Sequence, residues 1–132
     1  MKLSRTTGYA VQAALQLAQT PSGQPIPCSK LAATGGMPER FLLQILRSLV
    51  THGVLRSTRG VDGGYCLQKP PNETSLLDVI EAVEGPLTAQ VPADRLPPEM
   101  SRRLHASLLQ VSEHYRQQLA NVKLSKIIGN GG

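Results

Sequence analysis

The sequence of 132 residues predicts a mainly α fold with one two-stranded hairpin and a long C-terminal helix. Three observations lead to this fold class. Apolar residues recur at helical spacing in separate segments of the chain. A glycine-rich turn, Asp62-Gly63-Gly64, separates two short strand-like runs. Finally, a long apolar stripe occupies the last third of the chain.

Three helices are expected in the first half of the chain. The first covers Arg5–Gln19 with Ser4 as its N-cap, and a proline- and glycine-containing loop ends it. A short helix follows over about Pro27–Ala33. The third covers about Pro38–His52, with proline suited to its first turn. Its apolar stripe comprises Phe41, Leu42, Ile45, Leu46, Leu49 and Val50.

The hairpin follows the third helix directly, with strands expected over 54–58 and 65–68. Its turn needs positive φ, which glycine adopts without steric cost. Arg59 stands at its tip. Two helices joined by a tight glycine-containing turn, followed by a basic hairpin, are typical of a winged helix-turn-helix domain that binds DNA.

A fourth helix is expected over Leu76–Glu84, because Ser75 and Asp78 stand at capping-box spacing. The last helix covers about Pro98–Asn121. We therefore divide the chain into a winged helix-turn-helix domain (1–87), a connector (88–97), and a dimerisation helix with its tail (98–128).

The last helix carries a long stripe of apolar side chains, and the remaining chain is too short to cover both sides of it. Packing within the chain is one explanation. We favour packing against the same helix of a second subunit, because a symmetric dimer presents two DNA-reading units. The predicted dimer interface comprises Met100, Leu104, Leu108, Val111, Tyr115, Leu119 and Val122.

Charge and composition favour a polyanionic partner. The net charge is +5, and residues 1–69 carry eight basic against two acidic residues. No apolar run approaches the length that spans a bilayer, and no signal peptide is visible, so we expect a cytoplasmic protein without membrane contact. Two cysteines are too few for a disulfide scaffold.

Residue chemistry assigns roles in a DNA contact. Arg40 and Gln44 suit the edges of guanine and adenine. Arg47 is expected on a phosphate, and Arg59 in a narrow minor groove. Glu39 either accepts from cytosine or favours the helix N-terminus. Further candidates are Lys2, Ser4, Tyr9, Pro38, Leu43, Arg56, Ser57, Gly60, Gly63, Gly64 and Tyr65.

Some of these candidates have a structural alternative. Leu43 contacts thymine methyl groups or packs within the domain, and Tyr9 and Tyr65 suit the core at least as well as a DNA contact. Gly60, Gly63 and Gly64 would allow the backbone to approach phosphates closely.

The motifs Met1-Lys2-Leu3-Ser4, Gly8-Tyr9-Ala10, the wing 59–65 and the segment 77–85 resemble the Rrf-two family of bacterial transcription regulators. The resemblance covers about residues 1–87. It implies a homodimer that is crossed through its long helices and binds pseudo-palindromic operators as a sequence-specific transcriptional regulator.

Cluster-binding members of that family carry three cysteines between the fourth helix and the long helix. This chain has no cysteine over 86–104, and His105 alone is a poor ligand set for an iron–sulfur cluster. We therefore expect a member without the cluster, without another cofactor and without a metal site.

Two other functions stay open from the sequence. Cys28, in the first turn of the second helix where the helix dipole could lower its pKa, and Cys66 could form a thiol-based redox switch, or both could be small core residues. Alternatively, the domain could be a protein-interaction adaptor. An enzyme is not expected, because no catalytic motif or metal-ligand spacing is present.

Overall fold

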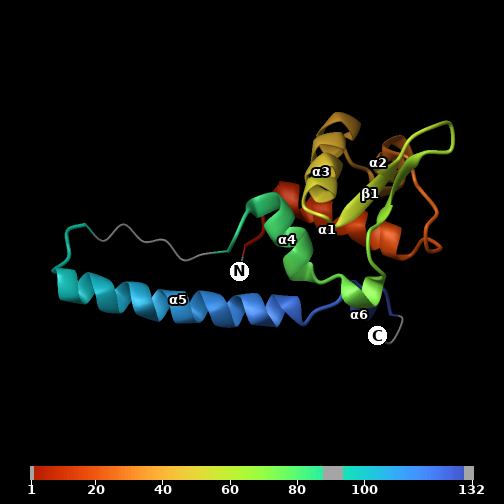
Figure 1. Cartoon of the computed structure of the whole chain (residues 1–132). Helices are drawn as coiled ribbons and strands as arrows, with labels where there is room; N and C mark the ends of the chain where they lie inside the picture. The colour runs from red at the N-terminus through yellow and green to blue at the C-terminus, as the bar shows by residue number, and fades with distance from the viewer. Residues whose placement is uncertain (1, 88–93, 130–132) are drawn as a thin grey trace.

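The computed structural model describes residues 2–87 and 94–129, and it confirms the mainly α fold with one hairpin (Figure 1). Most of the expected connector lies in 88–93, outside the described residues. The helices are α1 (Arg5–Ala18), α2 (Cys28–Gly35), α3 (Glu39–Thr51), α4 (Leu76–Glu84), α5 (Pro98–Ala120) and α6 (Leu124–Ile128), with a 3₁₀ turn η1 at Pro71–Glu73. The strands are β1 (Leu55–Thr58) and β2 (Gly64–Leu67).

The core lies where α3 crosses α1 and α4. Leu42, Leu46 and Leu49 of α3 are fully buried. They belong to the same buried cluster as alanines of α1, among them Ala10 and Ala14, whose small side chains allow two helices to approach closely. Packing these leucines inward turns the opposite face of α3 toward solvent.

The helix-turn-helix is formed by α2, a three-residue turn and α3. Gly36 ends α2 in the left-handed conformation with φ of 64°, and Met37 is buried beneath the turn. Pro38 has an extended backbone with ψ of 122°, so it caps α3 from outside and the helix begins at Glu39. The expected place of Pro38 in the first turn is therefore wrong by one residue.

The apolar stripe of α3 is narrower than the sequence pattern suggests. Phe41 is exposed and Val50 is half-buried. Both residues lie at the edges of the stripe, where neighbouring elements cover a side chain only in part.

The wing is an antiparallel hairpin in which Leu55 pairs with Leu67 and Thr58 with Gly64. Positive φ occurs at Gly60 (112°) and Gly64 (152°) but not at Gly63, where the sequence had also predicted it. A Cβ on Gly63 would lie 2.2 Å from the carbonyl oxygen of Thr58, so the turn requires glycine there for space.

The wing is also joined to the segment before α2. Backbone hydrogen bonds run both ways between Ile26 and Tyr65, at 2.9 and 2.8 Å. A Cβ on Gly64 would lie 2.3 Å from the carbonyl carbon of Ile26. This close approach of two backbones fixes the hairpin to the helix-turn-helix.

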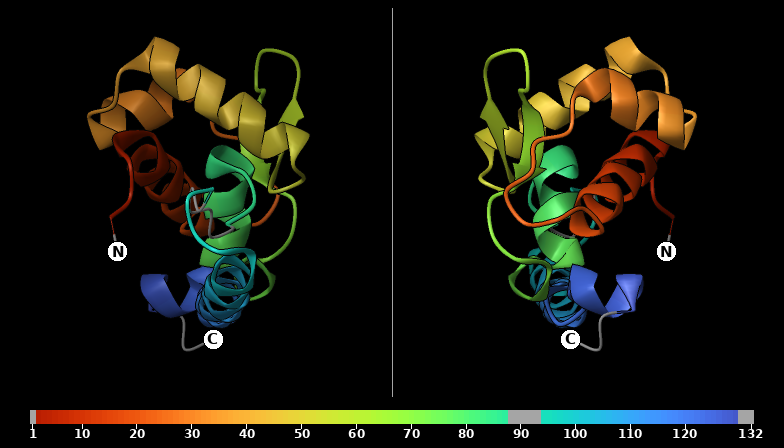
Figure 2. Two further views of the ribbon diagram at one scale, coloured as in Figure 1. Left: turned by 90° about the vertical axis from the view of Figure 1, so that its left-hand side faces the viewer. Right: turned by 90° about the vertical axis from the view of Figure 1, so that its right-hand side faces the viewer.

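The C-terminal segment returns to the first domain. The Leu76 N–H donates to the Val122 carbonyl, and the Leu124 N–H donates to the Thr74 carbonyl, both at 2.9 Å. Helix α6, for which the sequence showed no separate signal, packs beneath α1 (Figures 1 and 2). The C-terminal end of α5 is thereby anchored at the start of α4.

The remainder of α5 projects away from the packed helices (Figure 1). Its apolar residues Met100, Leu109 and Val111 are exposed. Among the described helices, none combines the length and apolar character that a bilayer crossing requires.

Candidate nucleic-acid interface

The outer face of α3 carries three polar side chains that have no partner among the residues described by the structure. Arg40, Gln44 and Arg47 are all exposed, opposite the buried leucines. Within residues 2–87 and 94–129, none of the three side chains forms a hydrogen bond or an ion pair. Their hydrogen-bonding groups are therefore free to meet a ligand that lies along α3.

The start of α3 combines a carboxylate and an aromatic pair. Glu39 is exposed in the first turn, where a negative charge complements the helix dipole. Phe41 packs edge-on against Tyr9 of α1, with ring centroids 5.8 Å apart. Tyr9 is half-buried, and Leu43 of α3 is also half-buried. The sequence pattern missed Phe41 as a surface residue, because it read Phe41 as part of the core stripe.

The wing tip is exposed and basic. The side chains of Ser57 and Arg59 are exposed, and Arg59 has no partner within the described residues. Gly60 has open space around its Cα, so an approaching molecule could contact its backbone. Gly63 and Gly64 are instead required by contacts within the fold.

Arg56 on β1 has a hydrogen-bond partner within the hairpin. Its Nε–H donates to Sγ of Cys66, its cross-strand partner, at 3.1 Å. Arg56 is exposed, so its positive charge remains accessible at the wing. One of its N–H groups is already engaged by Cys66.

The N-terminal end of α1 is held by polar contacts. Ser4 Oγ accepts the N–H of Thr7 at 3.1 Å as the N-cap and donates to Glu84 Oε1 at 2.6 Å. The Thr7 hydroxyl also donates to this carboxylate, and these two hydrogen bonds lower the pKa of Glu84. Ser4 thus has a structural role at the junction of α1 and α4, whereas Lys2 is exposed.

The environment of Cys28 is not that of an activated thiol. Cys28 is half-buried at the start of α2, and its S–H donates to the Glu39 carbonyl at 3.6 Å. Burial, and then the Glu39 carboxylate, raise the pKa of the Cys28 thiol. The expectation that the helix dipole lowers this pKa is therefore wrong, because desolvation and a nearby negative charge outweigh it. Cys66 is buried in β2.

The apolar side chains of the α5 stripe differ in how far they are buried by their own chain. Leu119 is only 6% exposed because it packs within its own chain, so it is withdrawn from the predicted dimer interface. Met100 and Val111 are exposed at 54% and 65%. The other stripe residues are half-buried: Leu104, Leu108, Tyr115 and Val122.

The model of the Rrf2 family, described as an iron-dependent transcriptional regulator, matches residues 3–130. The chain belongs to the Rrf2 family of transcriptional regulators. Its resemblance to this family, expected from the motifs in the first 87 residues, is confirmed over nearly the whole chain.

Named relatives support the same class. An HTH-type transcriptional regulator of Mycobacterium tuberculosis is 43% identical over 89 residues, which are 67% of this chain and 55% of that protein. The chain thus spans about half the length of that relative. An rrf2-like HTH-type regulator of Rhodobacter capsulatus is 30% identical over 134 aligned positions, covering 93% of this chain and 89% of that one.

The fold matches that of CymR, the global cysteine regulator of Bacillus subtilis, with a TM-score of 0.79. The match covers 98% of each chain at 22% identity, so it establishes the fold alone. The homologues and fold neighbours of this Rrf2 protein are transcriptional regulators and not enzymes.

The iron dependence in the family description does not fit the cysteines of this chain. An iron–sulfur cluster is held by several thiolates. The chain has two cysteines, one hydrogen-bonded to the Glu39 carbonyl and one buried beneath Arg56. Over the described residues, no three His, Cys, Asp or Glu side chains group as metal ligands.

Proposed function

We propose that this Rrf2 protein is a homodimeric, cytoplasmic transcriptional regulator that binds a pseudo-palindromic operator without an iron–sulfur cluster. The observation that carries the proposal is the free polar face of α3. Arg40, Gln44 and Arg47 are exposed and unpartnered within the described residues, and a helix of this kind fits the major groove. The adaptor alternative names no ligand for these hydrogen-bonding groups.

The wing supports the same ligand. Arg59 is exposed and unpartnered in the described part of the chain, on a hairpin that the Ile26–Tyr65 backbone bonds hold beside the helix-turn-helix. An arginine on such a tip suits the enhanced negative potential of a narrow minor groove. The helix would therefore read base edges while the wing reads groove shape.

The projecting α5 supports a dimer. Met100 and Val111 of α5 are apolar and exposed, and α5 extends beyond the packed helices (Figure 1). A second copy of the same helix would cover them and would place two recognition helices for two half-sites. Absence of a cluster is supported by the cysteine count. A thiol switch at Cys28 is disfavoured by the raised pKa of its thiol.

The test is selection of bound sequences from a random double-stranded DNA library, followed by affinity measurements against salt. We expect an inverted repeat with half-sites about one helical turn apart. The logarithm of affinity should fall with the logarithm of salt by about 0.9 per phosphate neutralised. No enrichment, with only weak binding that salt abolishes, would contradict the proposal and favour the adaptor.

Arg59→Ala provides the matched variant, with Arg102→Ala as control because Arg102 lies on α5 and pairs with Glu99. We expect Arg59→Ala to weaken operator binding and to relax the A·T preference beside each half-site. Binding by Arg102→Ala should equal that of the parent protein. Equal binding by both variants would remove the wing from the interface.

A further inference from the structure

A fork of two hydrogen bonds joins α5 to the first domain. Arg116 of α5 donates through Nε to Glu81 Oε2 at 3.0 Å and through a terminal nitrogen to Glu81 Oε1 at 3.1 Å. These side chains are only 33% and 21% exposed. By contrast, the pairs of Glu99 with Arg102 and Arg103 are long and largely exposed. A two-point fork fixes direction as well as distance.

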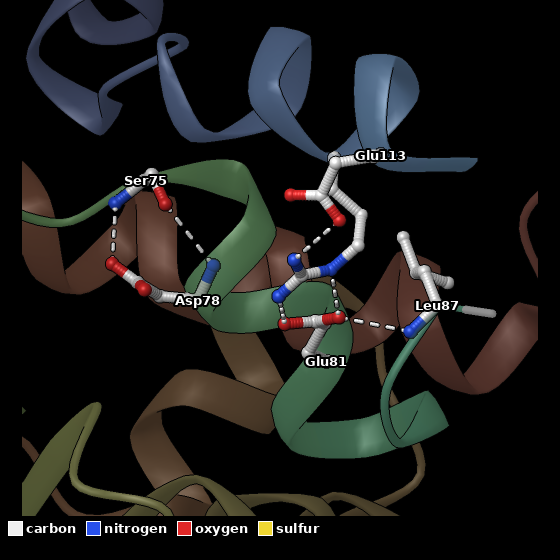
Figure 3. A network of polar contacts seen from close by, with 6 residues as sticks. Ser75, Asp78, Glu81, Leu87 and Glu113 are labelled. Atoms are coloured by element: carbon white, nitrogen blue, oxygen red, sulfur yellow. Dashed lines mark hydrogen bonds and ion pairs between the residues drawn. The ribbon is translucent and has the colours of Figure 1, made fainter. Parts of the chain in front are cut away.

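The same carboxylate also holds the chain where it leaves α4. Glu81 Oε2 accepts the backbone N–H of Leu87 at 2.8 Å. Figure 3 shows Glu81 between Leu87 on one side and the helix that carries Glu113 on the other. Glu113 adds a weaker contact to Arg116 at 3.5 Å. We call the set Glu81, Leu87 and Arg116 the α4–α5 clamp.

The clamp is connected to the recognition helix by rigid packing. Helix α4 packs against both α1 and α3, and its Val79 and Ile80 are buried. The backbone bonds between 74–76 and 122–124 already anchor the end of α5. Leu119 packs near this anchored end, and the fork at Arg116 adds a directional polar contact about one turn further along α5.

Small changes at the clamp would have large effects at the far end of α5. With a rise of about 1.5 Å per residue, Pro98 lies about 27 Å from Arg116 along the axis, and a tilt of about 10° would displace it by about 5 Å. Successive base pairs are about 3.4 Å apart. Such a tilt therefore corresponds to a shift of one to two base pairs.

We infer that Glu81 and Arg116 are positioning residues that set the spacing between the two half-sites that the dimer accepts. This inference rests on the proposed function. Neither residue touches DNA. They act by fixing the angle between the DNA-reading unit and the helix through which two subunits would meet, so that the two recognition helices stand at one separation.

The first test measures the angle without DNA. Spin labels are attached at Thr51→Cys on α3 and Ser107→Cys on α5, both exposed, in a Cys28→Ser background with labelled chains diluted by unlabelled ones. We expect a narrow distance distribution in the parent protein and a broader one in Arg116→Gln and Glu81→Gln. Glu113→Gln is the matched control, because it removes the weaker contact and leaves the fork. An unchanged distribution in the fork variants would overturn the inference.

The second test measures operator spacing. The selected operator is rebuilt with the two half-sites moved apart or together in single base-pair steps, and binding is followed by fluorescence anisotropy. In Arg116→Gln and Glu81→Gln, the preference for the best spacing over its neighbours should fall about fivefold or more. Affinity for one half-site and the salt slope should stay constant, because phosphate contacts are untouched.

The reversed pair Glu81→Arg with Arg116→Glu should recover part of the spacing preference. A purely structural role would instead lower half-site and operator binding equally in every fork variant, and that outcome would also overturn the inference. Failure of the parent protein to select any operator would contradict the proposed function, whereas the spin-label result would still decide whether the clamp fixes α5.

Discussion

Two arginines on α3 differ in the part of DNA that they are placed to contact. Arg40 stands in the first turn of the recognition helix and Arg47 two turns later, both exposed and without a partner in the described residues. Arg40→Ala should cost about 1–3 kcal/mol at one base position and relax specificity there. Arg47→Ala should weaken binding to all sequences similarly and make the salt slope shallower by about one.

Gel shifts on an operator series with single base substitutions check both arginines. The control is Arg95→Ala, an exposed residue just before α5. Loss of specificity at one base position in Arg47→Ala would assign the base contact to Arg47. Uniform weakening of binding in Arg40→Ala would assign the phosphate contact to Arg40.

Gly8 stands in α1 without a structural need for glycine. It is exposed, has helical rather than positive φ, and no heavy atom lies within 4 Å of a Cβ placed there. Gly8→Ala should raise the free energy of unfolding by about 0.5–1 kcal/mol, because alanine loses less backbone entropy on folding. Urea denaturation measures this.

Gly36 provides the comparison for Gly8. It also has open space, but its φ is 64°. Gly36→Ala should therefore destabilise the protein, since a side chain is strained in the left-handed region. A loss of stability in Gly8→Ala would mean that the first turn of α1 is strained in a way that its geometry does not show.

At the scale of single residues, periodicity predicted the polar face of α3, although it placed the exposed Phe41 in the core, and it predicted no long-range partners. The outer face of α3 follows from the 3.6-residue repeat, so Arg40, Gln44 and Arg47 could be predicted. The contact of Arg56 with Cys66 could not, because it depends on the strand register. The contact of Ser4 with Glu84 joins residues far apart in sequence, and no local pattern records it.

The wing is an element whose turn depends on one crowded glycine. In Gly63→Ala, the new Cβ would lie 2.2 Å from the Thr58 carbonyl oxygen, so the turn must deform. We expect a loss of about 1–3 kcal/mol in the free energy of unfolding, as for other overpacked sites. Operator affinity should fall with it, because Arg59 loses its fixed position.

Asp62→Ala is the matched control in the same turn, since Asp62 is exposed and has no partner within the described residues. Its unfolding free energy should stay within about 0.5 kcal/mol of the parent value. Equal stability of the two variants in urea would show that the turn adapts to a side chain at position 63.

The contact between α4 and α5 makes stability depend on pH. The Arg116 hydrogen bonds hold the pKa of Glu81 below its ordinary value near 4.5. A carboxyl with a lowered pKa in the folded state stabilises the protein fully above the ordinary pKa. That contribution is lost as pH falls through the folded-state pKa. Glu81→Gln should therefore show a smaller loss of stability than the parent protein below about pH 4.5.

Urea unfolding is measured from pH 3 to pH 7 in steps of about one pH unit, which follows the fall in unfolding free energy at low pH. Glu99→Gln is the control, because the Glu99 side chain is 62% exposed. An equal loss of unfolding free energy at low pH in the parent protein and in Glu81→Gln would show that the fork does not form in solution.

For the whole molecule, the projecting part of α5 predicts the oligomeric state. Val111 lies within the stripe proposed for the dimer and is 65% exposed. Val111→Glu should produce a monomer that keeps half-site binding but loses most affinity for the full operator, since a buried unpaired charge is costly. Sedimentation velocity and anisotropy measure the two quantities.

Leu109→Glu is the control for the dimer. Leu109 is 53% exposed and stands two residues before Val111, which places it about 200° around the helix, outside the stripe. It should remain dimeric. A dimer in Val111→Glu and a monomer in Leu109→Glu would place the interface on the other face of α5.

The sequence by itself determined the local elements of this Rrf2 protein and the face of α3 that is free. The end of α1, the capping box at Ser75 and the bounds of α4 and α5 follow from helical periodicity and caps, which act over a few residues. Its family also followed from motifs that are contiguous in the chain.

Only the tertiary structure decided how these elements meet. Leu119 is buried within its own chain. Glu81 and Arg116, which form a hydrogen bond, are 35 positions apart in the sequence. The backbones of Gly64 and Ile26 lie close together. The tertiary structure also returned α6 beneath α1. Each of these features depends on the approach of two segments that are distant in sequence. The free energy of such contacts comes from burial and geometry that no short window of residues contains.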